Sequence, residues 1–167
     1  ELEAIVSESY AEGMLQDHER EWVANILDLA RERVERIMRP RTQMTAIPVT
    51  ISEEEMLDLV VTAPYSRLPV YSGTIDHVVG MVHLKELMLR LQEDPDHQLT
   101  AGDIMREAIF IPEAARISTL LQLFRARNRH LAIVLDEYGG TAGLVNIEDI
   151  IEEIIGEIHD EHDSDEA

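Results

Sequence analysis

The chain has 167 residues, which is enough for one compact domain or for two small domains that share a core. It contains no cysteine, which excludes a disulfide framework and a thiolate metal site, and no run of the roughly 18 apolar residues needed to cross a membrane. Its formal net charge of −20 repels phosphate backbones at long range, which argues against a nucleic-acid partner but leaves room for a nucleotide in a local basic pocket.

Residues 1–36 are predicted to form an N-terminal helical linker. An amphipathic helix is expected over 2–12, with an interruption at Gly13. Asp17 can cap a second helix, in which apolar residues recur every three or four positions as far as Ile37. Pro40 then stops the helix. This apolar stripe either links the domain to a segment upstream, as a lever would, or packs on the domain itself.

Residues 37–92 are assigned to the first copy of a repeated unit. Strands are expected at 44–49, 67–71 and 78–82, and a closing helix at 83–90. Ser52 and Glu55 have the spacing of a capping box, which predicts a helix after the first strand. The apolar residues of that helix that are expected to face inward are Met56, Leu57, Val60 and Val61.

Residues 100–158 are assigned to the second copy, after a polar linker. Thr100 is a suitable cap for a short helical turn, and strands are expected at 108–111, 130–135 and 141–145. Helices are expected at 117–126 and 147–158. The glycine-rich segment at 139–143 resembles a phosphate-binding loop, but it lies between two strands, so it indicates a tight turn.

An acidic tail is assigned to residues 159–167, and the chain is expected to fray from Asp160 onward. His159 and His162 stand among acidic residues in this tail. They form either a metal site or, in the interpretation that we prefer, a charge cluster at the end of a helix. No metal ligands are therefore assigned.

The two copies share the order strand–helix–strand–strand–helix. Gly80 and Gly143 lie 63 positions apart, as do Leu68 and Leu131. A repeat of this period is typical of one supersecondary unit that is used twice. Each small unit exposes an apolar face, which the other copy can cover. The sequence therefore predicts an α/β pair of domains with pseudo-twofold symmetry, and we expect the function in a cleft between the two halves.

Four segments resemble a known family: residues 12–30 (EGMLQDHEREWVANILDLA), 34–44 (VERIMRPRTQM), 65–71 (YSRLPVY) and 129–163 (RHLAIVLDEYGGTAGLVNIEDIIEEIIGEIHDEHD). Each copy resembles a cystathionine-β-synthase (CBS) domain. The two together resemble the CBS-domain pair, or Bateman module, of the CorC/HlyC (hemolysin-like, CNNM-related) magnesium and cobalt efflux family. The resemblance implies a tandem CBS fold of the α/β (α+β) class and a regulatory module rather than an enzyme.

The resemblance also implies ligands and partners. Such a module binds ATP or AMP, with Mg2+ able to accompany ATP, and regulates cation transport. It forms a homodimer through its CBS modules and belongs to a larger protein with a transmembrane transport domain. That setting implies the cytoplasmic face of the inner (plasma) membrane, with this fragment itself soluble. The alternative is an assembly module whose dimerisation needs no ligand.

The strongest candidate for binding a ribose is the start of the last predicted helix. The segment 143–149 matches the CBS pattern Gly-x-x-Thr/Ser-x-x-Asp, with Asn146 in the Thr/Ser position. Asp149 can accept hydrogen bonds from both ribose hydroxyls. Asn146 can cap the helix and offer its amide to a phosphate. Alternatively, the two residues serve only as a helix cap with an acidic first turn.

The remaining candidate residues are implied by the resemblance. Met44 and Thr45 would flank the base. The phosphates would meet a second group: Tyr65, Ser66, Arg67, Pro69, Arg129 and His130. The alternatives are that the two arginines are solvated surface charges and that His130 is a rim residue.

The equivalent site in the first copy departs from the pattern. Glu86 stands in place of the aspartate and His83 in place of the cap residue. We therefore expect this second site to be empty or weak, which would give one nucleotide per chain. No spacing in the sequence indicates a catalytic Ser-His-Asp arrangement or a catalytic pair of carboxylates.

Overall fold

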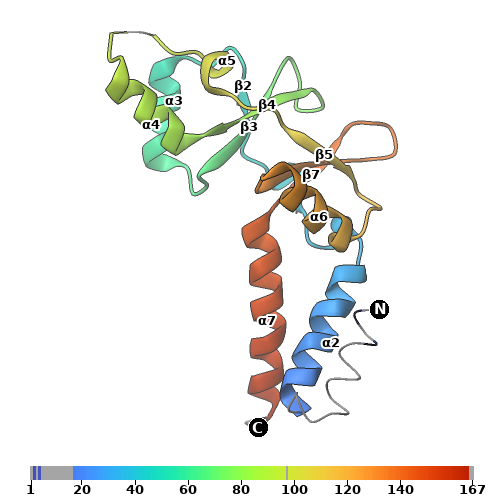
Figure 1. Cartoon of the computed structure of the whole chain (residues 1–167). Helices are drawn as coiled ribbons and strands as arrows, with labels where there is room; N and C mark the ends of the chain where they lie inside the picture. Colours follow the sequence, from blue (N-terminus) through green and yellow to red (C-terminus); the bar gives the residue numbers. More distant parts are fainter. Residues whose placement is uncertain (1, 3, 5–16, 97, 166–167) are drawn as a thin grey trace. The chain divides into compact units, whose positions relative to one another are not determined.

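The computed structural model describes residues 2, 4, 17–96 and 98–165, shown in Figure 1. The chain divides into two compact units. The first unit comprises Glu1–Met38, Ala114–His130 and Val145–Ala167, and the second comprises Arg39–Glu113 and Leu131–Leu144. Apart from Leu2 and Ala4, the predicted helix over 2–12 lies outside the described residues.

The first unit is helical. It contains α2 (Asp17–Arg31), the 3-10 turn η1 (Val34–Arg36), α6 (Ile117–Arg127) and α7 (Ile147–Asp165). The helix α2 contacts both α6 and α7, and Figure 1 shows α2 and α7 side by side. Each of the three helices turns apolar residues inward, so the unit is held together by apolar packing: Leu29, Ile117, Leu120, Phe124 and Ile150 are buried.

The prediction that the second helix continues to Ile37 is wrong, because α2 ends at Arg31. Beyond this point the backbone leaves the helix to pair with the segment before α6. Val34 donates its N–H to the carbonyl of Ala115 at 2.7 Å, and the Val34 side chain is fully buried. This tertiary pairing outweighs the helical periodicity that the apolar residues would otherwise follow.

The second unit contains two sheets. The first has the strand order β2-β3-β4, in which β2 (Ile47–Pro48) runs parallel to β3 (Arg67–Tyr71) and β3 antiparallel to β4 (Val78–His83). The helices α3 (Glu53–Thr62) and α4 (Leu84–Glu93) pack on one core through Met56 and Leu87. The capping box of Ser52 and Glu55 at the start of α3 is confirmed.

The second sheet has the strand order β1-β7-β6-β5, formed by β1 (Arg39–Pro40), β7 (Thr141–Asn146), β6 (Leu131–Leu135) and β5 (Ile109–Pro112). The strands β5 and β6 are parallel, as are β2 and β3 in the first sheet, so the two repeats share one topology. Each repeat has a short helical element near its start, η2 (Arg41–Gln43) in the first and α5 (Ala101–Ile104) in the second. Thr100 caps α5 as predicted, and Asp103 completes a capping box.

Three further predictions about elements are corrected. The strand expected over 44–49 is reduced to Ile47–Pro48, because a 3-10 turn occupies Arg41–Gln43 and Met44 is its C-cap. Leu57 and Val61, expected to face inward, are exposed, because Met56 takes the core side of α3. The helix α7 runs to Asp165 rather than fraying from Asp160, which is consistent with the intrinsic helix propensity of its glutamates.

The tips of two hairpins are joined in the second unit. The buried Thr141 donates its Oγ1–H to the carbonyl of Ile75 at 2.8 Å and its N–H to Asp76 Oδ1 at 3.1 Å. Arg41 forms an ion pair with the same carboxylate, which holds the pKa of Asp76 below its usual value. The turn between β6 and β7, with Gly139 at φ +81°, is therefore tied to the turn between β3 and β4.

The segment at the start of each repeat pairs with the last strand of the other repeat. Arg39 and Pro40 pair antiparallel with Leu144 and Gly143 of β7. At the matching place, Arg106 and Met81 exchange two backbone hydrogen bonds of 2.8 and 2.9 Å. We call this reciprocal arrangement the segment exchange. It requires a glycine in β4, because a Cβ atom on Gly80 would lie 2.9 Å from the Arg106 carbonyl oxygen.

Replacing Gly80 with alanine is therefore expected to destabilise the protein. The new methyl group would push against a backbone carbonyl that cannot move alone, at a cost of about 1–3 kcal/mol in the free energy of unfolding. Urea denaturation measures this change as a lower midpoint with an unchanged slope. The control is Gly102→Ala, where the nearest atom lies at 3.6 Å and a helix gains from alanine. A Gly80→Ala variant as stable as Gly102→Ala would contradict the segment exchange.

Candidate functional site

The start of α7 brings together two of the predicted site residues in the first unit. Asn146 is the last residue of β7, and its N–H donates to Asp149 Oδ2 at 3.1 Å. The carboxylate thus caps the helix from its third position, which is half of a capping box. Both side chains are half-buried. This hydrogen bond fixes the Asp149 carboxylate at the positive end of the helix dipole, whereas the predicted cap by the Asn146 side chain stays a prediction.

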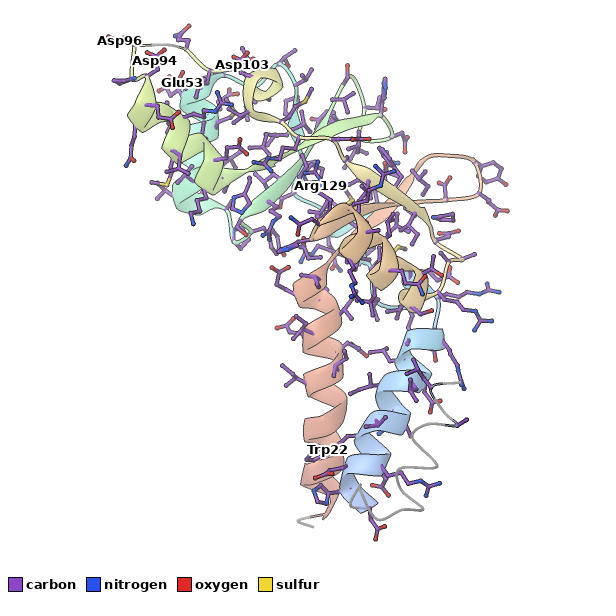
Figure 2. All side chains as sticks on the ribbon, viewed as in Figure 1. Trp22, Glu53, Asp94, Asp96, Asp103 and Arg129 are labelled. Atoms are coloured by element: carbon purple, nitrogen blue, oxygen red, sulfur yellow. The ribbon has the colours of Figure 1, made fainter. Side chains whose placement is uncertain are left out.

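Arg129 and His130 reach the same helix start through a left-handed turn. Asn128 closes α6 with φ +52°, a conformation that Asn tolerates better than most residues. The chain then reverses, and the carbonyl of His130 accepts the N–H of Ile147 at 2.8 Å. Arg129, labelled in Figure 2, follows Asn128, the C-cap residue of α6. In the first unit, four predicted residues accordingly lie around one helix terminus: Arg129, His130, Asn146 and Asp149.

In the second unit, the predicted phosphate residues lie at the start of β3. Arg67 is half-buried and pairs with His83 across the antiparallel β3–β4 ladder. Tyr65 lies two residues earlier, and the Arg39 guanidinium carbon stands 3.8 Å from the centre of its ring. This cation–π contact adds a second positive charge next to the predicted group.

The other predicted residues of the second unit differ in accessibility. Ser66 is exposed, and its carbonyl accepts the N–H of Leu84 at 2.9 Å. Pro69 is buried within β3 and has no N–H to donate. Met44 and Thr45 are half-buried and follow η2, and the Met44 side chain packs against the core cluster around Met81. Met44 thus serves the core as well as any ligand.

Glu86, the counterpart of Asp149 in the first repeat, is engaged by an arginine. Arg106 Nε donates to Glu86 Oε2 at 2.9 Å, and the Glu86 side chain is only 23% exposed. Arg106 is itself held by the segment exchange. A sugar would therefore have to compete with a guanidinium for this carboxylate, as the departure of Glu86 and His83 from the CBS pattern suggests.

No group of three or more His, Cys, Asp or Glu side chains is arranged to hold a metal ion among the residues that the structure describes. Figure 2 labels four acidic residues of the second unit, Glu53, Asp94, Asp96 and Asp103. Two of these carboxylates accept backbone hydrogen bonds: Glu53 accepts the N–H of Leu99, and Asp103 accepts the N–H of Thr100. The glycine-rich segment at 139–143 forms a hairpin turn, as predicted, in which Asp136 accepts the N–H groups of Tyr138 and Gly140. The side chains of His159 and His162 lie outside the described part of α7.

Comparison with known proteins decides the family. The CBS-domain model matches residues 34–93 and 101–156. A solved structure of the CBS domain of the bacterial CNNM/CorC family Mg2+ transporter is 40% identical, with a TM-score of 0.79, and the match covers 93% of this chain and 94% of that one. The chain is a CBS-domain pair of the CorC/CNNM family. The predicted fold class, a tandem CBS pair, is thereby confirmed.

Other relatives of this CBS pair extend the comparison. The magnesium and cobalt efflux protein CorC of Escherichia coli K12 is 36% identical over 166 residues, which cover 99% of this chain and 56% of the relative. The pair thus spans little more than half the length of that protein. None of the described helices is both long and apolar enough to cross a membrane.

Two further solved structures contain nucleotides. The CNNM/CorC CBS domain in complex with ATP is 42% identical, with a TM-score of 0.75 over 83% of this chain and 97% of that one. A CBS-domain pair with bound AMP from Klebsiella pneumoniae is 28% identical, with a TM-score of 0.63 over 74% and 98%. These ligands belong to the relatives, and they define what should be tested for this CBS pair.

Arg39 is a candidate that reasoning from the sequence missed. The signal was nonetheless available, because Ile-Met-Arg occurs both at 37–39 and at 104–106, near the start of each repeat. These matched arginines occupy the same place in the segment exchange but have different partners, the Tyr65 ring for Arg39 and the Glu86 carboxylate for Arg106.

His83 should make the stability of the CBS pair sensitive to acid. Its Nδ1 accepts the N–H of Lys85 at 3.1 Å at the start of α4, which requires an unprotonated ring nitrogen. Burial, followed by the positive charge of Arg67, lowers the pKa of His83 below its ordinary 6.5. The unfolded chain then binds more protons than the folded one below this pH. The contribution to stability is therefore complete above pH 6.5 and declines as the pH falls toward the folded-state pKa.

The variant His83→Asn keeps an acceptor at the cap but cannot titrate. We expect the difference in free energy of unfolding between wild type and His83→Asn to shrink between about pH 7.5 and about pH 5.5. The exposed His77 provides the matched control, since His77→Asn should retain the pH dependence of the wild type. Parallel pH profiles for wild type and His83→Asn would refute the assignment.

Proposed function

We propose that this CBS pair is the regulatory module of a magnesium or cobalt transport protein and that it binds an adenine nucleotide, ATP or AMP. Mg2+ accompanies ATP by screening its phosphates. The module sits on the cytoplasmic face of the membrane as part of a larger protein whose transmembrane domain carries the cation. The similarity to the ATP-bound CNNM/CorC domain, 42% identical, supports this proposal.

The observation that carries the proposal is the carboxylate at the start of α7. Asp149 stands in the CBS-pattern position, and one of its oxygens is held by the Asn146 N–H. A carboxylate oriented in this way can accept charge-assisted hydrogen bonds from a ribose diol. Arg129 and His130 lie at the same helix terminus, which favours anions. We assign the ribose to Asp149, with Asn146, Arg129 and His130 as further contacts.

The predicted residues of the second unit are also proposed as nucleotide contacts. Arg67 supplies positive charge for the phosphates, and Ser66 supplies an exposed hydroxyl group. Tyr65, with Arg39 over its ring, offers an aromatic surface beside a cation. Met44 and Thr45 are proposed to flank the base, and Pro69 belongs to the segment proposed to meet the phosphates.

The regulatory step is a shift between conformations of the module. A nucleotide can favour one conformation only by as much as it binds that conformation more tightly. The helix α2 precedes the first repeat and packs on α6 and α7, so a change at the start of α7 can reach it. We propose that α2 carries the change toward the transport domain.

Isothermal titration calorimetry with ATP, AMP and ADP, each with and without Mg2+, tests this function. We expect Asp149→Ala to weaken nucleotide binding by about 1.5–3 kcal/mol, roughly 10- to 150-fold, because a hydrogen bond to a charged group is lost. Glu148→Ala removes the same charge from the same helical turn and should bind normally. Glu86→Ala should also bind normally, because Arg106 already occupies that carboxylate. Equal losses in Asp149→Ala and Glu86→Ala would refute the asymmetry.

A second candidate function is ligand-independent assembly, and the exposed apolar side chains of α3 and α4 favour it. Leu57 and Val61 are one helical turn apart on α3, and Val61 is 85% exposed. Met88 and Leu89 are exposed on α4. A dimer that shows no heat with any of the three nucleotides would favour assembly alone.

Both candidate functions include a homodimer, which we assign to this apolar surface. Val61→Glu should convert the dimer to a monomer, since it places a charge in an apolar contact. Size-exclusion chromatography with light scattering measures the mass. Thr62→Glu adds the same charge at the neighbouring exposed residue and should stay dimeric. A Val61→Glu protein that remains a dimer would place the contact elsewhere.

A further inference from the structure

Four arginines gather around one cavity of the first unit, where α2 gives way to the segment that pairs with the start of α6. The cavity has a volume of about 470 Å³, and its charged lining consists of Arg31, Glu32, Arg33, Glu35, Arg36 and Arg116. The chain has only 14 lysines and arginines against 34 acidic residues, yet here four arginines face two glutamates. This arginine cavity is therefore locally positive in a strongly acidic protein.

The backbone forces two of these arginines together. Arg33 and Arg116 face each other in an isolated antiparallel bridge. Val34 donates to the Ala115 carbonyl at 2.7 Å and Ile117 to the Glu32 carbonyl at 2.9 Å, so the two hydrogen bonds flank the pair instead of joining it. This is the narrow type of antiparallel pair, with Cα atoms about 4.5 Å apart. Like charges directly opposite each other destabilise a ladder, unless an anion lies between them.

The glutamates of the lining do not remove this positive charge. Glu35 lies 3.8 Å from Arg33, at the long end of the range for an ion pair, and the Arg33 side chain is 67% exposed. Arg36 lies 3.4 Å from Glu32 and 4.0 Å from Glu153 of α7. Each guanidinium has five N–H donors in a planar fork. Arg33 has one carboxylate at 3.8 Å and Arg116 donates to the Arg31 carbonyl at 3.2 Å, so these two arginines keep donors for a further anion.

The start of α6 adds to the positive electrostatic potential of the arginine cavity. Its N-cap residue is Arg116, which makes no capping hydrogen bond with its side chain, and its first turn contains no acidic residue. The positive end of an 11-residue helix thus opens toward the arginines without the usual compensation. In contrast, the first turn of α7 carries Glu148 and Asp149.

We propose that the arginine cavity binds a phosphate group. The planar fork of arginine matches the oxygens of a phosphate, and a doubly charged anion would relieve the repulsion between Arg33 and Arg116. The volume falls within the range of about 300–1,000 Å³ for small-molecule sites, which allows a phosphorylated organic molecule. This site is separate from the proposed nucleotide contacts, because it shares no residue with them.

The phosphate can come from a soluble metabolite or from a lipid headgroup, and two measurements separate the sources. The first is the melting temperature in inorganic phosphate compared with sodium chloride at equal ionic strength. The second is co-sedimentation with vesicles of phosphatidylglycerol compared with phosphatidylcholine. Both use the full chain in wild-type form and as Arg33→Gln. The matched control is Arg125→Gln, which removes one charge from the other end of α6.

Phosphate should raise the melting temperature of the wild type and of Arg125→Gln more than chloride does, whereas Arg33→Gln should lose most of this gain. Its apparent affinity for phosphate should fall about tenfold, as expected for the loss of one charge-assisted contact. A gain in melting temperature that depends on Arg33 supports a soluble phosphate ligand. Co-sedimentation with phosphatidylglycerol vesicles that depends on Arg33 supports a lipid headgroup. If Arg33→Gln does not fold, Arg116→Gln takes its place.

Equal shifts with phosphate and chloride would reveal only screening and would overturn the proposal. The same holds if Arg33→Gln keeps the full phosphate effect and vesicle binding is absent or independent of Arg33. The proposed nucleotide function stays testable on its own, since Arg33→Gln should bind ATP normally and Asp149→Ala should keep the phosphate effect.

Discussion

The segment exchange is the constraint on which the second unit depends. The first strand of each sheet is short, since β1 and β2 are each two residues long. Arg39 and Pro40 complete the sheet of the second repeat by pairing with β7, and Arg106 satisfies the backbone of Met81 in the first repeat. Buried backbone groups need such partners. Neither repeat supplies them alone, which explains why the two copies occur as a pair.

The exchange also separates what the two repeats share from what distinguishes them. The backbone pairing is the same in both halves of the exchange, so Arg39 and Arg106 occupy equivalent positions. Their side chains nevertheless meet different partners, because Tyr65 attracts one guanidinium and Glu86 the other. In this duplicated fold, Arg106 occupies the Glu86 carboxylate of the first repeat, whereas the matched Arg39 stacks on the Tyr65 ring. A difference of a few side chains suffices, without any change of topology.

Local signals in the sequence predicted most of the elements, whereas contacts between distant segments escaped it. The cap at Ser52 was predictable because its partners lie within one turn. The end of α2 was not, because Val34 leaves the helix for a partner far along the chain. Val61 was placed inward because a helix with many apolar residues does not reveal which of them meets the core. In the same way, spacing identified the cap at α7, but no pattern indicates that Arg33 and Arg116 face each other.

The joined hairpin tips have a consequence for how the second unit opens. Thr141 is buried and hydrogen-bonded to Ile75 and Asp76, so moving either tip leaves polar groups of the other without partners. We therefore expect the two turns to open as one cooperative unit, whose amide hydrogens share a single opening free energy. Loops that would otherwise fluctuate separately are thereby coupled, and ordering either one slows the motion of both.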